Sequence, residues 1–308
     1  MKRRWHTRQT TFRQLEILLA VAERRSVTAA AEALHLAQPT VSTQVAKLAE
    51  AVGAPLFEQV GRQMHLTEVG EDVVRAARSL FDVLDGLEMR LAQRAGLEVG
   101  RLRIAVVTTA KYLIPRWLGS FCAQHPGITP ELQIANRGEV IRRLQHNLDD
   151  LYVFSHPPYE LDIHAEPLTD NPLVMIAPTG HRLAGRRLNW SDLAGERLLM
   201  RETGSGTRYA VERFLAQQAW PLPDHVTIAS TEAIKEAVAA GLGVGIVSRH
   251  ALTHMAPGNI TELDVAGLPI PNSWYLVTLR GKQLSPAALA FKQHVGEQLA
   301  KVPGHGAA

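Results

Sequence analysis

The segment AQPTVSTQVAKL, residues 37–48, combines the apolar spacing of a short helix with an outer face of small polar side chains. Val41, Val45 and Leu48 recur at i, i+4 and i+7, which predicts one buried face. Pro39 suits the first turn of a helix, where its missing N–H would have no partner in any case. The opposite face presents hydroxyls, amides and a single lysine, with no acidic residue before Glu50, and is therefore suited to hydrogen bonding with an anionic partner.

The residues before this segment predict a helix-turn-helix. Apolar residues from Phe12 to Ala22 have helical spacing, and SVTAAAEALHL, residues 26–36, is an alanine-rich helix former that Ser26 or Thr28 can cap. In such a pair the second helix enters the major groove of DNA, with its N-terminal residues on the base edges. We therefore expect base or phosphate contacts from Gln38, Pro39, Thr40, Ser42, Thr43, Gln44 and Lys47.

A hairpin and a long helix are expected next. Leu56-Phe57 and Met64-His65-Leu66 flank Gly61-Arg62, which predicts a β-hairpin wing with Arg62 at its tip as a further DNA contact. Thr67 then caps a helix over residues 67–97. The apolar residues of this helix step by three and four, a heptad pattern that predicts dimerisation through residues 67–95: they are Val69, Val73, Ala76, Leu80, Val83 or Leu84, Leu87 and Leu91.

Residues 12–71 resemble the winged helix-turn-helix of LysR-type transcriptional regulators, from FRQLEILLAVAERRSVTAAAEALHL through AQPTVSTQVAKL to LFEQVGRQMHLTEVGE. Three positions depart from the family pattern. Ala29 replaces a basic residue of the first helix, Gln59 replaces the arginine of the wing, and Ala49 replaces a glutamate. The loss of two cations predicts weaker phosphate contacts, for which the basic residues before Phe12 are a candidate compensation.

Charge and composition agree with a DNA-binding end on a neutral body. Residues 1–65 hold 9 Lys and Arg against 5 Glu, a net +4, and the remainder holds 24 basic against 25 acidic residues, a net −1. A basic end favours a polyanion such as double-stranded DNA as partner. The single cysteine, Cys122, cannot form an internal disulfide, which fits a reducing cytoplasm; we expect a buried inert thiol there, with a redox switch as the alternative. No apolar run approaches the roughly 20 residues of a membrane span.

From Arg101 onward, short β-rich runs alternate with helical ones, which predicts an α/β body. The resemblance to LysR-type proteins implies a two-lobed effector domain like periplasmic binding proteins. The whole chain is then an α+β multidomain protein: residues 1–66 bind DNA, 67–97 form the linker, and 98–308 bind an effector. We expect lobe I over about 101–163 and 267–300 and lobe II over about 164–266, with the chain crossing near 162–166 and 264–269.

Polar residues at the ends of predicted strands are the candidate effector contacts. Thr108, Thr109 and Lys111 follow a strand and are expected to open a helix, whose N-terminus would attract an anion. The loop in RETGSGTR, residues 201–208, is a candidate cradle for a phosphate or carboxylate, although it lacks the spacing of a nucleotide-binding P-loop. Ordinary capping and turn formation are the alternatives for both. The candidates are Thr108, Thr109, Lys111, Asn136, Arg137, Glu202, Ser205, Gly206 and Thr207; Glu232 and Lys235 rank lower because they are spaced as a surface ion pair.

Several stretches of the body resemble the carbon-fixation subgroup of the LysR family, among them NRGEVIRRLQHNLDDLYVFSHPPYELDI, RETGSGTR and STEAIKEAVAAGLGVGIVSRHAL. The resemblance implies control of carbon-fixation or inorganic-carbon-uptake genes by a small anionic metabolite, in a tetramer that acts with RNA polymerase. Ser155-His156 and Thr203 depart from the subgroup pattern near the expected cleft. The alternatives are a LysR-type regulator of another operon and an enzyme acting on a phosphorylated metabolite. We expect no enzymatic activity, cofactor or metal, because the 13 histidines show no metal-binding spacing.

Overall fold

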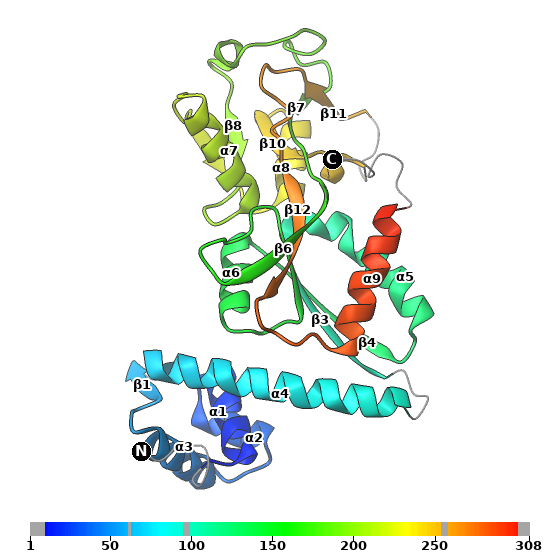
Figure 1. Ribbon diagram of the computed structural model, residues 1–308. Coiled ribbons are helices and arrows are strands. Elements are labelled where there is room, and N and C mark those ends of the chain that lie inside the picture. The colour runs from blue at the N-terminus through cyan, green and yellow to red at the C-terminus, as the bar shows by residue number, and fades with distance from the viewer. Residues whose placement is uncertain (1–9, 61–62, 95–98, 254–257, 301–308) are drawn as a thin grey trace. The chain divides into compact units, whose positions relative to one another are not determined.

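The computed structural model describes residues 10–60, 63–94, 99–253 and 258–300 (Figure 1). The chain divides into two compact units, each of which is described by itself. The first contains the N-terminal helices, the hairpin and the long helix, and the second contains two five-stranded sheets with their helices.

The helix-turn-helix is present as predicted. Helices α1 (Phe12–Arg24), α2 (Val27–Ala33) and α3 (Gln38–Val52) pack on one another. Ser26 rather than Thr28 caps α2, because its side chain accepts the hydrogen bond from the Ala29 amide. Val41 and Leu48 of α3 are fully buried. The predicted inner face of residues 37–48 is therefore part of the core.

The wing and the long helix complete this unit. Strands β1 (Phe57–Val60) and β2 (Gln63–Leu66) pair antiparallel, and the predicted tip residue Arg62 lies outside the described residues. Helix α4 (Glu68–Arg94) follows. A Cβ placed on Gly70 would lie 2.0 Å from the Leu56 carbonyl oxygen, so glycine lets α4 approach the start of the wing.

Part of the apolar stripe of α4 is exposed, and part of it packs in the core of its own unit. Val73 is 8% exposed and packs with Val74 and Ala77 against α1, so it is not free to form a dimer seam as predicted. The other large apolar residues of the predicted dimer seam are about half exposed: Val69, Leu80, Val83, Leu87 and Leu91. These five residues form the exposed stripe of α4, and their part in dimerisation stays a prediction.

The first sheet of the second unit defines lobe I. Its strand order is β4-β3-β5-β12-β6, with β3 (Gly100–Val107), β4 (Ile128–Ala135), β5 (Leu151–Phe154), β6 (Ile163–Asp170) and β12 (Ser273–Leu279). Strand β3 runs parallel to β4 and β5, whereas β12 is antiparallel to β5 and β6. The lobe also contains η2 (Thr108–Tyr112), α5 (Ile114–Gln124), α6 (Arg137–Gln145) and α9 (Pro286–Ala300), and α5 and α9 lie side by side (Figure 1).

The second sheet defines lobe II. Its order is β11-β7-β10-β8-β9, with β7 (Leu173–Pro178), β8 (Leu198–Met200), β9 (His225–Thr227), β10 (Val244–Ser248) and β11 (Ile260–Leu263). Strands β8, β9 and β10 are parallel, so their carboxyl ends share one edge. Helices α7 (Gly206–Gln217) and α8 (Thr231–Ala239) and the short turns η3 (Trp190–Leu193) and η4 (Arg249–Leu252) complete the lobe.

The chain crosses between the lobes further along than predicted. Strand β6 pairs with β12 in the first sheet, so lobe I extends to Asp170, and the crossings lie at residues 171–172 and 270–272 instead of near 162–166 and 264–269. The sequence does not predict strand β6, because IHAEPLTD lacks a clean apolar alternation. It also contains Pro167, which has no N–H to donate to a neighbouring strand. Pro167 sits at a register shift of the strand pair, which tolerates the missing donor. None of the helices in the described part of the chain combines the length and the apolar character of a membrane span.

Candidate nucleic-acid interface and effector cleft

Helix α3 presents the polar face that its sequence predicts, with one change. Gln44 is half-buried, and its Oε1 accepts a hydrogen bond of 3.0 Å from Nε2 of the buried Gln14 in α1. Gln44 therefore helps to hold α3 on α1 and does not lie on the outer face. The other predicted contacts of α3 are exposed: Gln38, Pro39, Thr40, Ser42, Thr43 and Lys47.

The start of α3 has the electrostatics of an anion-binding helix end. Its N-cap residue, Ala37, offers no side-chain acceptor, and the first turn contains no acidic residue. The first backbone N–H groups of a helix have no partner within the helix, and the helix dipole favours negative charge beside them. A phosphate of a DNA backbone fits this end, while the exposed hydroxyls and amides can address base edges.

In lobe I, the segment after β3 differs from the prediction. Residues 108–112 form the 3-10 helix η2, and α5 begins only at Ile114, so Thr108 and Thr109 do not open an α-helix that could bind an anion. Thr108 Oγ1 donates to the Ala135 carbonyl at 3.1 Å. The buried Thr109 accepts from Nε1 of Trp274 at 3.1 Å. Both hydroxyls thus stabilise their own lobe.

Lys111 instead reaches across to lobe II. Its Nζ lies 2.7 Å from Oε2 of Glu232 at the start of α8, and the Tyr112 hydroxyl donates to the other oxygen of the same carboxylate. Partial burial alone would raise the pKa of Glu232, but the hydrogen bonds from Lys111 and Tyr112 lower it to about 2. We call the contact between Lys111 and Glu232, which the Tyr112 hydroxyl supports, the interlobe ion pair.

The predicted surface pair of Glu232 with Lys235 is replaced by these contacts. Lys235 is 7% exposed and donates to the Ala251 carbonyl at 2.9 Å. Its Nζ also lies 5.8 Å from the centre of the Tyr112 ring. Glu232, which ranked low from the sequence, is therefore the lobe II carboxylate of the interlobe ion pair.

The glycine-containing loop of lobe II is built around a buried arginine. Arg201, 3% exposed, makes two hydrogen bonds to the Glu202 carboxylate, at 2.7 and 2.9 Å, and a third to Thr231 Oγ1 at 2.8 Å. Ser205 and Thr207 are buried as well. Among the predicted loop contacts, the Glu202 carboxylate is therefore paired with the Arg201 guanidinium. Arg201 itself is not predicted from the sequence, because it stands at the end of a predicted strand.

The start of α6 faces this loop across the lobes. The Gly138 amide donates to the Gly204 carbonyl at 3.3 Å. Asn136 caps α6 by accepting from the Glu139 amide at 2.9 Å. Arg137 Nε donates to the His156 carbonyl at 3.0 Å. The structure thus brings the 136–138 segment of lobe I against the 202–207 loop of lobe II, and the role of these residues in effector binding stays a prediction.

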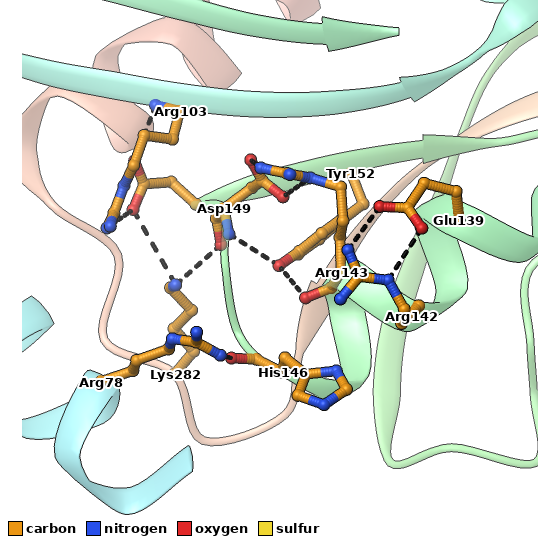
Figure 2. Close-up of polar contacts among 10 residues, drawn as sticks. Arg78, Arg103, Glu139, Arg142, Arg143, His146, Asp149, Tyr152 and Lys282 are labelled. Atoms are coloured by element: carbon orange, nitrogen blue, oxygen red, sulfur yellow. Dashed lines mark hydrogen bonds and ion pairs between the residues drawn. The ribbon is translucent and has the colours of Figure 1, made fainter. Parts of the chain in front are cut away.

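A buried polar network holds the other end of α6 to β5. Figure 2 shows Arg143 of α6 paired with Asp149, at 2.9 and 2.7 Å. The Tyr152 hydroxyl donates to the Arg143 carbonyl and accepts from the Asp149 amide, and burial raises the pKa of this tyrosine. Arg103 of β3 pairs with Asp150 at 3.0 Å. This framework fixes α6 and therefore the position of Asn136 and Arg137 at its start.

Comparison with known proteins decides the family. Residues 12–71 match the model of the bacterial regulatory helix-turn-helix proteins of the lysR family, and residues 95–300 match the LysR substrate binding domain. The chain belongs to the LysR family. It is a DNA-binding transcriptional regulator with an N-terminal helix-turn-helix and a C-terminal effector domain, as the sequence predicts.

Three relatives are informative. The chain is 43% identical to the transcriptional activator CmpR of Synechocystis over 94% of this chain and 95% of that protein. It is 41% identical to the RuBisCO operon transcriptional regulator of Acidithiobacillus ferrooxidans over 94% of each chain. Among solved structures, the regulatory domain of CcmR from Synechocystis in complex with 2-PG is similar with a TM-score of 0.61 and 41% identity, covering 64% of this chain and 96% of that one.

Proposed function

We propose that this regulator controls carbon-fixation or inorganic-carbon-uptake genes in response to a small anionic metabolite. The observation that carries the proposal is the pair of lobe I cations at the lobe boundary. Lys111 pairs with Glu232 at the start of α8, and the Arg137 guanidinium lies over the Tyr209 ring of α7 in lobe II. The relatives named for the RuBisCO operon, and the CcmR domain solved with 2-phosphoglycolate, support the same effector class.

The DNA contacts are proposed from the exposed face of α3. Thr40, Ser42, Thr43 and Gln38 would address bases, and Lys47 would pair with phosphate. Pro39 shapes the first turn, and Arg62 would extend the contact from the wing. Gln44 would act by positioning α3, since Gln14 already binds its oxygen.

The effector would bind where the two lobes meet, with Lys111 and Arg137 as the charge-bearing contacts and with the 202–207 loop supplying backbone and hydroxyl groups. An incoming carboxylate or phosphate competes with Glu232 for the Lys111 ammonium. Binding then changes the contacts that join the lobes. It regulates only if the effector binds two arrangements of the protein with different affinity.

The exposed stripe of α4 supports a proposed dimer. Two copies would pair along residues 67–95, which gives the two-fold symmetry of a palindromic operator. Further pairing of effector domains would produce a tetramer. The regulator would act in the cytoplasm, where its remaining partner is RNA polymerase.

The test uses the full chain and DNA from upstream of the neighbouring divergently transcribed gene. Mobility shift and DNase footprinting are performed with and without phosphorylated C2–C5 metabolites and NADPH. A footprint that one metabolite alters supports both parts of the proposal. Binding that no metabolite alters removes the carbon-fixation assignment and favours a LysR-type regulator of another operon. Failure to bind any duplex at low salt would contradict the role of α3 and would return the enzyme alternative.

A further inference from the structure

The buried side chain of Gln14 in α1 connects the N-cap of its own helix to the middle of α3. Its Oε1 accepts a hydrogen bond of 2.9 Å from the Thr11 amide, and the Gln14 amide donates to Thr11 Oγ1 at 3.2 Å, so the two residues form a capping box. Its Nε2 donates to Oε1 of Gln44 at 3.0 Å. Gln14 is 6% exposed and uses both ends of its carboxamide inside the helix-turn-helix unit.

The capping box decides the orientation of both carboxamides. A carboxamide has an acceptor oxygen at one end and two N–H donors at the other. Because the Thr11 amide can only donate, the oxygen of Gln14 faces Thr11 and its nitrogen faces Gln44. Because that nitrogen can only donate, the oxygen of Gln44 faces Gln14. The Gln44 nitrogen is then the free end of the side chain, and it has no hydrogen-bond partner within the described residues.

The free end of Gln44 borders the polar face of α3. Thr40 and Lys47, which are its i−4 and i+3 neighbours on the helix surface, are both exposed, and Gln44 itself is half-buried. The N–H donors of Gln44 therefore lie beside side chains that are proposed to contact DNA, while its oxygen is held against α1.

A side chain that offers only donors distinguishes bases by their keto oxygens. In the major groove, guanine presents O6 and thymine presents O4 as acceptors, whereas adenine and cytosine present amino groups. An unrestrained glutamine can pair with adenine by using its oxygen and its nitrogen together. Gln44 lacks that choice, because turning its amide would set its own N–H groups against those of Gln14.

We propose that Gln44 recognises a keto oxygen of the operator, guanine O6 or thymine O4, and that Gln14 is the positioning residue that fixes this preference. The inference rests on the proposed role of α3 in binding DNA, and it goes beyond the role of Gln44 in holding α3 on α1. Gln14 touches no base. It acts through Gln44, and the Thr11 amide in turn holds Gln14.

The first experiment searches the operator for the keto oxygen that Gln44 contacts. The full-length protein is titrated against duplexes in which one base at a time is replaced by 6-thioguanine or 4-thiothymine, which exchange the keto oxygen for sulfur, a weak acceptor. At one base of the half-site this exchange is expected to weaken wild-type binding about two- to tenfold, the contribution of one hydrogen bond. Gln44→Leu is expected to be insensitive to the exchange at that base and to stay sensitive at the others.

Gln14→Glu reverses the orientation of Gln44. Glutamate keeps the capping box, because one carboxylate oxygen still accepts from the Thr11 amide. The other oxygen then faces Gln44, whose amide turns to donate to it and presents its own oxygen to DNA. At the base found with the sulfur analogues, this variant is expected to prefer adenine over guanine, or cytosine over thymine, by about two- to tenfold. Gln44→Glu is expected to show the same reversal, because it also presents an acceptor.

Gln63→Glu is the matched control. It adds the same charge to the same unit, at an exposed position of β2 that belongs neither to the capping box nor to α3, and it is expected to keep the wild-type preference at that base. Each preference is a ratio between two duplexes bound by one variant, so a uniform effect of the added charge cancels. Circular dichroism and binding to the unmodified operator confirm that each variant is folded.

Two results would overturn the inference and leave α3 as the DNA-binding helix. The first is a Gln44→Leu variant that weakens binding to every duplex equally, as loss of a phosphate contact would, or that does not weaken it at all. The second is a folded Gln14→Glu variant that keeps the keto preference of the wild type. Failure of the wild-type protein to bind any duplex would contradict the proposed role of α3, and the inference with it.

Discussion

Lys111→Gln and Glu232→Gln are expected to change effector affinity in opposite directions, although each breaks the same ion pair. In the proposed site Lys111 supplies the ammonium that binds an anionic effector, and in this structure Glu232 pairs with that ammonium at an N–O distance of 2.7 Å. Removing the lysine removes a contact, whereas removing the carboxylate removes a competing anion. A pair that served only to join the lobes would give both substitutions the same sign.

The magnitudes follow from the charge and exposure of the two side chains. A hydrogen bond to a charged group contributes roughly 1.5–3 kcal/mol, so Lys111→Gln should weaken effector binding about ten- to hundredfold. Two anions about 5 Å apart repel by about 3 kcal/mol at an effective dielectric constant of about 20, and by less than about 1 kcal/mol in water. Because the Glu232 side chain is 46% exposed, the lower value applies. Glu232→Gln should then tighten binding about fivefold.

The assay is calorimetric titration of the full-length variants with 2-phosphoglycolate at pH 7.5. Glu236→Gln serves as the matched control, since Glu236 is exposed on the same helix, α8, and lies outside the interlobe ion pair. It should bind as the wild type does. Weaker binding in both Lys111→Gln and Glu232→Gln, or unchanged binding in both, would refute the competition between effector and carboxylate.

Three other outcomes are expected. Gly70→Ala places a Cβ 2.0 Å from the Leu56 carbonyl oxygen and should destabilise the DNA-binding unit by about 3 kcal/mol in thermal unfolding, whereas Gly86→Ala in the same helix should be neutral or stabilising by about 0.5–1 kcal/mol. Lys47→Gln should reduce the slope of log binding constant against log salt by about 1 per subunit in operator titrations, with the slope unchanged if Lys47 contacts no phosphate. The stabilisation from Glu232, whose pKa is lowered from 4.5 to about 2, is complete above about pH 4.5 and is lost as pH falls toward 2. The difference in Tm between wild type and Glu232→Gln should therefore shrink between pH 5 and pH 2.5, and a constant difference would contradict the assigned pairing.

The sequence predicts most elements of this fold because their apolar periodicity is strong and local. The inner face of residues 37–48 is buried as its spacing indicates, and the long helix after Thr67 is present. The sequence does not predict strands β6 and β11, because neither is a continuous apolar run. The buried Val73 illustrates a second limit. A heptad seam and the packing face of α4 on α1 share that residue, and spacing alone does not say which neighbour covers it.

The candidate site is harder to predict because its decisive pairs are remote in the chain. Lys111 and Glu232 are separated by 121 residues, and nothing in the local sequence of either one indicates the other. Local spacing instead couples Glu232 with Lys235, an assignment that fails because Lys235 is buried and binds a backbone carbonyl. His156 is a similar case, because its position in the sequence shows only a departure from the family pattern. Burial and the charges of Arg213 and Arg137, which come from two helices in different lobes, together lower its pKa. Residue types therefore predict that this boundary binds an anion, but the tertiary pairing decides which cations are occupied by protein carboxylates and which remain available to a ligand.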